Sequence, residues 1–327
     1  MIRIAFDVMG FENKIEQAIT AAKHFIAQFS DVQIILVGDQ KQIQPHIQQS
    51  TKISIVDTKE FISMEDSPVA GLRKIMSSMS LACKLVKENK ADALVSAGNT
   101  SCFVPMVYSK LGLISGASCV GLMPYIPTID KTGFNMVDVG ANINVSPINL
   151  YHYALMANTY VKVCRNIFSP TIGLLNIGTE HHKGFAYHKQ TNELLQKDKS
   201  LNYVGFVEPK NLLQHPVDIA ICDGYAGNLV LKTLEGSLKS VADLMKNHYK
   251  KPWNWLAAAM SIPLFRTISK TFDYRNNAAA IVLGVNGIAV KTHGSADSIQ
   301  FLSALKMAYH MVHKRIIDEL KKIKYGN

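Results

Sequence analysis

Short apolar strands alternate with amphipathic helices from the start of the chain, and few folds satisfy this pattern. The stretch "IRIAFDV" at 2–8 is typical of a strand, apolar residues then recur at helical spacing from Ile15 to Phe29, and "QIILVGD" at 33–39 is typical of the next strand. "KISIVDT", a helix within 70–90 and "ADALVSAG" continue the pattern. Such alternation builds a mostly parallel sheet with helices on both faces. We therefore predict a three-layer α/β/α sandwich.

The later part of the chain extends this sheet without a visible linker or repeat. Strand-like segments follow at 171–178, 203–209 and 217–224, and Ser146 with Pro147 forms a helix-start signal. We therefore predict a single domain over residues 1–327. Residues 236–275 are the exception, because they form two helical segments broken near Pro252. They predict a protruding helical hairpin.

Composition restricts the class of protein. Apolar residues make up 48% of the 327 residues and charged residues 18%, which predicts a folded globular protein. The five cysteines form no CxxC pair, and we expect buried, reduced thiols. The chain starts directly with a strand pattern, and no apolar run reaches the roughly 18 residues that span a bilayer. These features predict a cytoplasmic protein.

The formal net charge of +10 indicates an anionic partner of some kind. Nucleic acid is disfavoured, because the sequence has no zinc-finger spacing, no aromatic RNA-binding motif and no long Lys/Arg run. Membrane lipid, an acidic protein or simple solubility remain open at this point.

Several expected strand ends run into small or amide-bearing turns. They are "SAGNT" at 96–100, "DVGAN" at 138–142, "NIGTEHHKG" at 176–184, "CDGYAGN" at 222–228, and "VNG" at 285–287 with "KTHGSAD" at 291–297. In a parallel sheet we expect all these carboxyl ends to open on the same edge, where α/β folds place ligands. Glycine N–H groups and helix N-termini favour anions. The set predicts a phosphate-sized anion site lined by Asn99, Asp138, Gly140, Asn142, Asp223, Gly224, Asn228, Asn286 and Gly294.

Familiar catalytic and metal motifs are missing from the sequence. No GxGxxG follows a strand, and neither GxSxG nor HExxH occurs. "DKTG" at 130–133 resembles the end of a Walker loop, but Asp130 stands where glycine is needed. Adjacent His181 and His182 lack the spacing of helical metal ligands, so we expect solvated side chains and no metal.

The sequence allows two roles for each of two further residues near the expected site. Lys183 lies just beyond the "NIG" turn and before Gly184, where its amine could reach the anion site or simply remain solvated. His293 in "KTHGSAD" could be catalytic or could only satisfy nearby backbone groups.

The strand-end motifs, "LKTLEG" after "CDGYAGN", and "LGVNGIAVKTHGSAD" resemble, in order, the bacterial phosphate acyltransferases of phospholipid synthesis, the PlsX family. The resemblance covers nearly the whole chain and implies one α/β/α domain related to the phosphotransacetylase and isopropylmalate dehydrogenase folds. It also implies a homodimer that associates peripherally with the membrane. The implied reaction transfers a fatty acyl group from acyl carrier protein to inorganic phosphate, without a cofactor. The acyl phosphate then serves a glycerol-3-phosphate acyltransferase.

The resemblance gives roles to the candidate residues. Lys183, His293 and Asn228 become the catalytic candidates, with Lys183 stabilising the developing oxyanion while amides and glycine N–H groups position phosphate. The positive net charge would steer the acidic acyl carrier protein toward the enzyme. A phosphotransacetylase-like enzyme that uses acyl-CoA is an alternative reading, and so is a scaffold that binds acyl carrier protein and membrane without turnover.

The first strand-end loop departs from the family pattern. Where the family usually has "DAMGGDxxP", this chain has "DVMGFENKI", so Phe11, Glu12 and Ile15 replace glycine, aspartate and proline. We expect Phe11 to give up the backbone turn that a glycine allows. This change motivates the scaffold alternative.

The tip of the predicted hairpin is strongly apolar. "WNWLAAAMSIPLF" at 253–265 is too short to cross a bilayer, and lysines and arginines flank it. This pattern is typical of a segment that lies in an anionic membrane surface, with Trp253, Trp255 and Leu256 as contact residues. Packing against the matching hairpin of a second copy is the alternative, since aromatic residues also favour protein interfaces.

Overall fold

The computed structural model describes residues 1–47, 50–249, 255–272 and 279–325. Its strands are β1 (Ile2–Asp7), β2 (Val32–Gly38), β3 (Ile53–Asp57), β4 (Ala93–Ser96), β5 (Gly121–Ile126), β6 (Phe134–Val137), β7 (Thr171–Leu175), β8 (Asn202–Val207), β9 (Ile219–Ile221), β10 (Ala280–Leu283) and β11 (Ile288–Lys291). Its α-helices are α1 (Ile15–Gln28), α2 (Gln40–Ile43), α3 (Pro68–Arg73), α4 (Ser78–Lys87), α5 (Thr100–Leu111), α6 (Pro147–Cys164), α7 (Ala186–Lys197), α8 (Gly224–Tyr249), α9 (Trp255–Thr271), α10 (Ser298–His313) and α11 (Ile316–Lys321). Two 3₁₀ turns, η1 (Gln44–His46) and η2 (Pro209–Gln214), complete the set.

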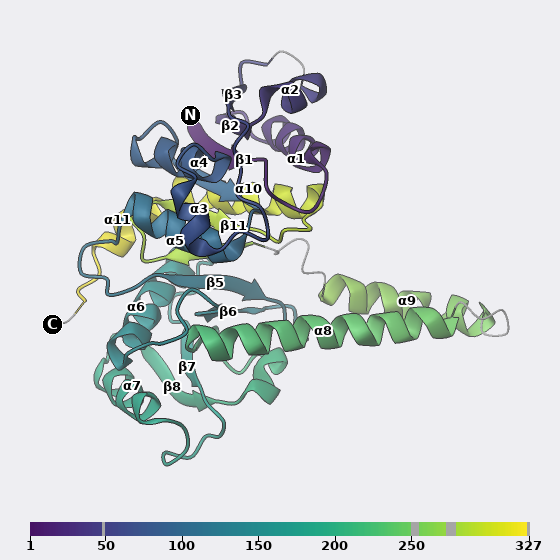
Figure 1. Ribbon diagram of the computed structural model, residues 1–327. Coiled ribbons are helices and arrows are strands. Elements are labelled where there is room, and N and C mark those ends of the chain that lie inside the picture. Colours follow the sequence, from purple (N-terminus) through teal and green to yellow (C-terminus); the bar gives the residue numbers. More distant parts are fainter. Residues whose placement is uncertain (48–49, 250–254, 273–278, 326–327) are drawn as a thin grey trace.

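The strands of the described residues form a sheet in the order β3-β2-β1-β4-β11-β10-β5-β6-β9-β7-β8. Helices cover both of its faces (Figure 1). Most neighbouring pairs are parallel, and the antiparallel pairs are β11–β10, β10–β5 and β5–β6. The predicted three-layer α/β/α sandwich with a mostly parallel sheet is confirmed.

Strand direction reverses in the middle of this sheet. β1, β2, β3, β4 and β11 run one way, whereas β6, β9, β7 and β8 run the other way. The cause is the odd number of antiparallel pairs between these two sets of strands, namely β11–β10, β10–β5 and β5–β6. Short connections join β10 to β11 and β5 to β6, and strands joined in this way pair antiparallel. The expectation that all the strand ends open on the same edge is therefore wrong.

The apolar core consists of two clusters. Ile4 and Phe6 of β1 belong to one cluster, together with side chains of α1, α6 and α10. Ala5, between them in the sequence, belongs to the other cluster, with side chains of α4 and α5. Successive strand residues point to opposite faces, so the two clusters are the two sides of the sheet.

Helix α6 begins as the sequence predicts. Ser146 is its N-cap, with Oγ accepting from the backbone N–H of Asn149 at 3.3 Å, and Pro147 occupies the first turn. The side chain of Asn149 accepts in return from the N–H of Ser146 at 2.8 Å. Such a cap contributes about 1 kcal/mol to helix stability.

Helices α8 and α9 leave the body of the molecule side by side (Figure 1). Tyr249 links them, because its hydroxyl lies 3.2 Å from Oγ of Ser261 and its ring centroid 5.0 Å from that of Phe265. Helix α8 begins at Gly224, twelve residues before the expected start of the hairpin at 236, and its 26 residues measure about 39 Å. The hairpin is therefore a direct continuation of the loop that follows β9.

The three predicted membrane-contact residues lie at the start of α9 or before it. Trp253 lies outside the described residues, and Trp255 and Leu256 open the helix. Among the described residues, no helix is both long enough and apolar enough to cross a bilayer.

Candidate active site

Three loops that the sequence singled out meet at the carboxyl ends of β6, β9 and β7, which are adjacent and parallel in the sheet. The loops are residues 138–142, 222–228 and 176–184, and we call them the α8 loop group. They carry Asp138, Gly140, Asn142, Asp223, Gly224, Asn228 and Lys183. These predicted site residues therefore come from neighbouring strand ends.

Asp138 shapes the first of these loops from within. Its Oδ1 accepts from the N–H groups of Leu122 at 3.0 Å, Gly140 at 3.1 Å and Ala141 at 2.9 Å, and its Oδ2 accepts from Asn142 N at 2.7 Å. Burial raises the pKa of this carboxyl above its ordinary value, and these backbone hydrogen bonds oppose that shift. The geometry thus gives Asp138 a role in holding the loop rather than in binding phosphate.

Asn142 ties the same loop to the core and to α8. Its side-chain amide donates to the carbonyl of Val120 and, at 2.8 Å, to the hydroxyl of Tyr153. Its backbone carbonyl accepts from Gly224 N at 2.9 Å. A Cβ on Gly224 would lie 2.5 Å from that carbonyl oxygen, so only glycine allows α8 to begin so close to this loop.

Asp223 is committed to the start of two helices. Its Oδ1 accepts from Ala226 N in the first turn of α8 at 2.8 Å. Its Oδ2 accepts from the hydroxyl of Tyr187 in α7 at 3.2 Å, and the Tyr187 ring lies 4.2 Å from that of His188. Burial lowers the pKa of His188, which keeps this imidazole neutral near pH 7. The sequence reading missed Tyr187 and His188, because only the fold brings α7 against α8.

Asn228 and Gly140 are exposed residues of the α8 loop group that lie next to each other. Asn228 lies in the first turns of α8 with an exposed side chain. Gly140 has a φ of +133°, and a Cβ built on it would lie 3.8 Å from Cγ of Asn228. An amide side chain thus stands beside a bare backbone segment at the N-terminus of a long helix, which is a favourable place for an anion.

Lys183 lies in a loop that a buried asparagine anchors. Asn176 donates from Nδ2 to the carbonyl of Lys183 at 3.3 Å, and its Oδ1 accepts from Ile177 N at 2.9 Å. Gly184 has a φ of +83°, and a Cβ there would lie 2.5 Å from Oδ1 of Asn176. Lys183 itself is half-buried. The asparagine was not singled out from the sequence, although a buried amide directly after an apolar strand was the available signal.

The charges around Lys183 are of both signs. Glu180 accepts from Lys183 N through its carbonyl at 3.0 Å. A backbone hydrogen bond, followed by the charges of Lys183, His182 and Lys210, holds the pKa of the Glu180 carboxyl below its ordinary value. His181 and His182 are exposed. Within the described residues, no three His, Cys, Asp or Glu side chains gather in an arrangement that could hold a metal.

A second group of predicted residues lies at the carboxyl ends of β1, β4 and β11, in residues 8–14, 96–100 and 291–297, which we call the β11 loop group. Asn99 caps α5 and donates from Nδ2 to the carbonyls of Ser63 at 3.2 Å, Met64 at 3.0 Å and Asp66 at 3.0 Å. Its amide is therefore used to hold a neighbouring loop.

His293 and Gly294 follow β11 in the same group. The exposed His293 has its Nδ1 2.7 Å from Oγ of Ser295, and this nitrogen accepts from Ser295 N at 3.2 Å. The carbonyl of Gly294 accepts from Glu12 N at 2.9 Å, which joins this loop to the first one. His293 thus satisfies nearby backbone and keeps its other ring nitrogen for further contacts.

The unusual first loop keeps its turn. Gly10 has a φ of +69°, and a Cβ there would collide with the carbonyl oxygen of Ile62. Phe11 is not in the left-handed region, and its ring packs against that of Phe301 with centroids 5.1 Å apart. The tight turn of this loop therefore lies at Gly10, while Phe11 stays outside the left-handed region and adds an aromatic contact with α10.

Asn286 does not join either group. It follows β10, and its backbone N–H donates to the carbonyl of Gly112 at 2.9 Å. Because β10 and β11 are antiparallel, Asn286 lies at the amino end of β11 while His293 lies beyond its carboxyl end. The four residues of β11 separate them by about 13 Å, so Asn286 does not line a site with His293.

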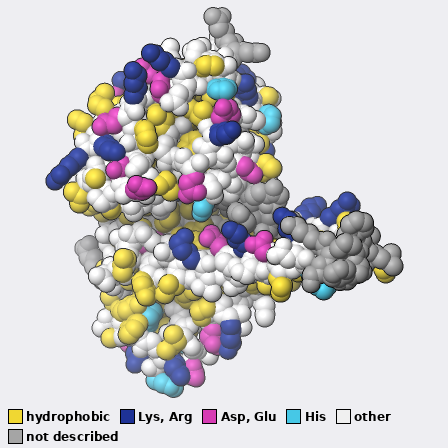
Figure 2. Space-filling view, turned by 45° about the vertical axis from the view of Figure 1, so that its right-hand side comes forward, with side chains coloured by type: hydrophobic (Ala, Val, Ile, Leu, Met, Phe, Trp, Pro, Cys, Tyr) yellow, Lys and Arg dark blue, Asp and Glu magenta, His cyan; other side chains and the backbone are white. Residues whose placement is uncertain are grey.

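The two loop groups lie on different halves of the molecule, and their strands run in opposite directions. The twist of the sheet makes the angle between these strands smaller than it would be in a flat sheet. Adjacent strands are rotated by roughly 20–25°, so the four steps from β11 to β9 rotate the strands by about 80–100°. Figure 2 shows a waist between the half with the amino-terminal strands and the half that α8 leaves. Carboxyl ends that would point apart in a flat sheet can thus border the same waist.

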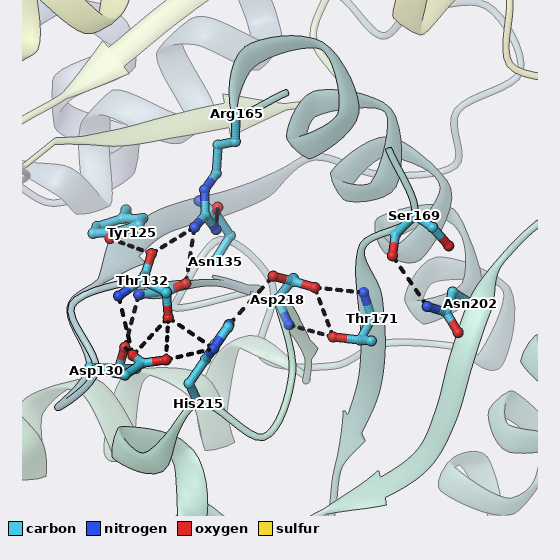
Figure 3. A network of polar contacts seen from close by, with 12 residues as sticks. Tyr125, Asp130, Thr132, Asn135, Arg165, Ser169, Thr171, Asn202, His215 and Asp218 are labelled. Carbon is cyan, nitrogen blue, oxygen red and sulfur yellow. Dashed lines mark hydrogen bonds and ion pairs between the residues drawn. The ribbon is translucent and has the colours of Figure 1, made fainter. Parts of the chain in front are cut away.

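A separate polar network occupies the amino ends of β6, β9 and β7, at the opposite end of these strands from the α8 loop group (Figure 3). Asp130 accepts from Thr128 Oγ1 at 2.5 Å and from Thr132 N at 3.2 Å, and its Oδ2 lies 3.1 Å from Nδ1 of His215. The hydroxyls of Thr128 and Thr132 lower the pKa of the Asp130 carboxyl. The "DKTG" segment is therefore a hydrogen-bonded turn.

The chain matches a family model and known proteins over nearly its whole length. A family model described as "Fatty acid synthesis protein" matches residues 2–319. The phosphate acyltransferase of Malacoplasma penetrans is 48% identical over 317 residues, which cover 97% of this chain and 96% of that protein. The phosphate acyltransferase of Ureaplasma parvum is 46% identical over 323 residues, which cover 98% and 97%.

Solved structures agree on the fold. A phosphotransacetylase from Streptococcus pyogenes superposes with a TM-score of 0.63 at 13% identity, covering 97% of this chain and 94% of that one. Full-length similarity to the curated relatives goes further and fixes the class of enzyme. The chain belongs to the phosphate acyltransferase family of fatty acid synthesis proteins, and it is an acyltransferase.

Proposed function

We propose that this enzyme transfers a fatty acyl group from the thioester of acyl carrier protein to inorganic phosphate. The acyl phosphate formed would supply a glycerol-3-phosphate acyltransferase and so phosphatidic acid synthesis. The observation that carries the proposal is the α8 loop group, where exposed Asn228, bare Gly140 and the half-buried Lys183 stand at adjacent strand ends. This arrangement suits a reaction whose nucleophile is an anion.

The chemistry needs no nucleophilic side chain, because phosphate itself attacks. A phosphate oxygen adds to the thioester carbonyl carbon, and the carbonyl oxygen becomes an oxyanion. The oxyanion then collapses, the carbon–sulfur bond breaks, and the thiolate leaves with the electron pair and takes a proton. The Lys183 ammonium would stabilise the oxyanion, while Asn228 and the positive end of α8 hold phosphate in line.

The direct test is mass-spectrometric detection of acyl phosphate from acyl carrier protein thioester and phosphate. Acyl-CoA is supplied in a parallel reaction, because the fold similarity to a phosphotransacetylase favours that donor as the alternative. Lys183→Met removes the proposed oxyanion partner, and Lys189→Met, an exposed lysine of α7, is the matched control. Acyl phosphate from neither donor would favour the non-catalytic scaffold.

We further propose that the α8–α9 hairpin serves a homodimer and an anionic membrane surface. It exposes apolar side chains on both helices, including Leu244 at 71% and Met260 at 77% exposure. Among the side chains that the structure describes, further exposed apolar ones on the two helices include Leu229, Leu238, Val241, Ile262, Leu264 and Ile268. Lys246, Arg266 and Lys270 lie on the same helices, where they would meet lipid headgroups. One face would pack against a second copy while the tip contacts lipid.

Trp255→Glu with Leu256→Glu tests the membrane part of this proposal. The double variant should lose sedimentation with anionic vesicles and keep its dimer and its turnover with dissolved substrates. Light scattering and vesicle sedimentation provide the readouts. A monomeric or unfolded double variant would instead make the hairpin tip a protein interface.

A further inference from the structure

Three polar side chains lie side by side inside the molecule, each as the last residue of its strand. Asp7 of β1 is in register with Ser96 of β4, and Ser96 is in register with Lys291 of β11. All three are buried, and Lys291 is only 5% exposed. Residues at the same level of adjacent parallel strands point to the same face of a sheet. A lysine therefore ends an otherwise apolar strand in the interior, two strands away from an acid and with Ser96 between them.

Hydrogen bonds connect this row to the backbone beyond every one of the three strands. Ser96 Oγ donates to Asp7 Oδ2 at 2.7 Å and accepts from Gly98 N at 3.0 Å. Asp7 Oδ1 accepts from Met9 N at 3.3 Å. The ammonium of Lys291 donates to the carbonyl of Thr292. The backbone N–H of Thr292 in turn donates to the carbonyl of Ser96 at 3.0 Å. The row thus fixes the points where the β11 loop group begins.

Opposite charges offset the cost of burying the ammonium. Burial lowers the pKa of Lys291 to about 7, and the charges of Asp7 and Glu12 oppose this shift. Burial likewise raises the pKa of Asp7 to about 6, opposed by hydrogen bonds from Ser78 and Ser96. Both side chains therefore carry their charges together only between these two pKa values, near neutral pH.

The other titratable groups around the row come from different elements. Cys83 of α4 lies near Asp7, and burial together with the Asp7 charge raises the pKa of its thiol, which stays neutral. His293 follows Lys291 by two residues and is exposed. Glu12 belongs to the first loop, where its carboxylate lies 3.1 Å from the position of a Cβ on Gly294. Its negative charge favours the protonated form of Lys291.

We propose that Lys291 is a positioning residue for the acyl transfer, whose ammonium holds the backbone of residues 8–14 and 292–297 so that turnover requires its protonated form. Lys291 acts through the Thr292 carbonyl and through Asp7 rather than by touching a substrate. Glu12 tunes it from outside. The inference rests on the proposed function, because the regulated step is acyl phosphate formation.

The test is the pH profile of acyl phosphate formation in the wild type, Lys291→Arg and Glu12→Gln. Arginine keeps its charge at any pH of the assay, so Lys291→Arg should move the alkaline limb upward by about 2 pH units or more. Glu12→Gln removes a charge that favours the ammonium, so it should move the limb downward by about 0.5 pH unit. Phosphate also titrates near neutral pH, and comparison among variants removes its contribution.

Glu16→Gln is the matched control. It makes the same charge change in the exposed first turn of α1, where Glu16 lies 3.7 Å from His46 rather than near the row. This variant should keep the wild-type limb. Lys291→Met should lower kcat roughly 10-fold or more while the phosphate KM stays within about threefold, because positioning is lost rather than phosphate binding.

Two results would overturn the inference. The first is an alkaline limb that neither Glu12→Gln nor a folded Lys291→Arg moves. If Lys291→Arg does not fold, Glu12→Gln decides by itself, since Glu12 is exposed. The second is an NMR titration of labelled lysine in which Lys291 titrates like an ordinary lysine. A wild type that makes no acyl phosphate contradicts the proposed function instead, so the two failures are distinguishable.

Discussion

The two loop groups place their cations in different surroundings. In the α8 loop group, Lys183 is half-buried in the loop after β7, and the acidic residues Asp138 and Asp223 are occupied by backbone N–H groups and a tyrosine hydroxyl. In the β11 loop group, Lys291 is buried in the same row as Asp7, and Asn99 is occupied by three carbonyls. A cation that meets a substrate must remain reachable, whereas a cation that holds a loop is best enclosed. The difference separates chemistry from positioning.

The strongest test of this difference is Lys183→Met. We expect it to reduce turnover roughly 100-fold or more while acyl carrier protein still binds, the usual scale for removal of one oxyanion donor. Steady-state kinetics and a binding titration provide the two numbers. Turnover within threefold of the wild type would show that Lys183 does not stabilise the oxyanion.

The buried Lys291 should instead affect how the free energy of unfolding depends on pH. The pKa of Lys291 is lowered from 10.5 to about 7 in the folded protein, so the unfolded chain binds an extra proton between these values. This contribution to stability is present above pH 10.5 and is lost as the pH falls to about 7. The free energy of unfolding of the wild type should rise relative to Lys291→Met by at most about 1.4 kcal/mol per pH unit.

Urea unfolding of both proteins at several pH values measures this contribution. A difference between them that does not change with pH would mean that Lys291 titrates normally in the folded state. Asp7 has the opposite sign, because its pKa is raised from 3.8 to about 6, and its contribution is lost as the pH rises through that range. The two windows do not overlap, so the experiment separates them.

A third test compares an exposed residue from each group. Asn228→Ala and His293→Ala should both raise the phosphate KM, by about 10-fold for Asn228, which stands at the α8 N-terminus. His293 should give the smaller increase, because Nδ1 of its ring is already engaged with Ser295. A phosphate KM that changes in neither variant would remove both residues from the site.

The smallest expected effect is a change in salt dependence. Affinity for the acidic acyl carrier protein should fall as salt rises from low to physiological strength, since exposed charges are screened over about 10 Å at 0.1 M. Lys291→Met should leave this dependence unchanged, because a buried charge contributes little to steering. Binding that does not respond to salt would mean that the net charge of +10 serves another purpose.

Much of the fold is readable in the sequence because it depends on local patterns. Strand and helix periodicity predicted the layered sandwich, and "SPIN" at 146–149 predicted the start of α6. The same local reading failed at β5 and β6, where a short connection replaces a crossover helix and the two strands pair antiparallel. It failed again at β10 and β11, whose antiparallel pairing puts Asn286 at the other end of β11 from His293.

The candidate site was only partly readable for a related reason. Glycines and amides after strands can be found by eye, so the loops of both groups were identified. The hydrogen-bond partners of the polar side chains in these loops cannot be found in this way. Asp138, Asn142 and Asn99 form hydrogen bonds with backbone groups far away in sequence. Lys291 begins the segment "KTHGSAD", but the sequence alone does not distinguish a buried lysine from a solvated one.

The sequence by itself determined the layered α/β architecture, the loops that hold the candidate site residues and, through its motifs, the enzyme family. These properties depend on side-chain periodicity and on residue types at short spacing, which the chain states directly. The tertiary structure decided which strand ends share a side, which polar residues are already occupied, and which of two lysines is enclosed. Those properties depend on strand direction, sheet twist and burial, and they arise only when segments distant in the chain pack together.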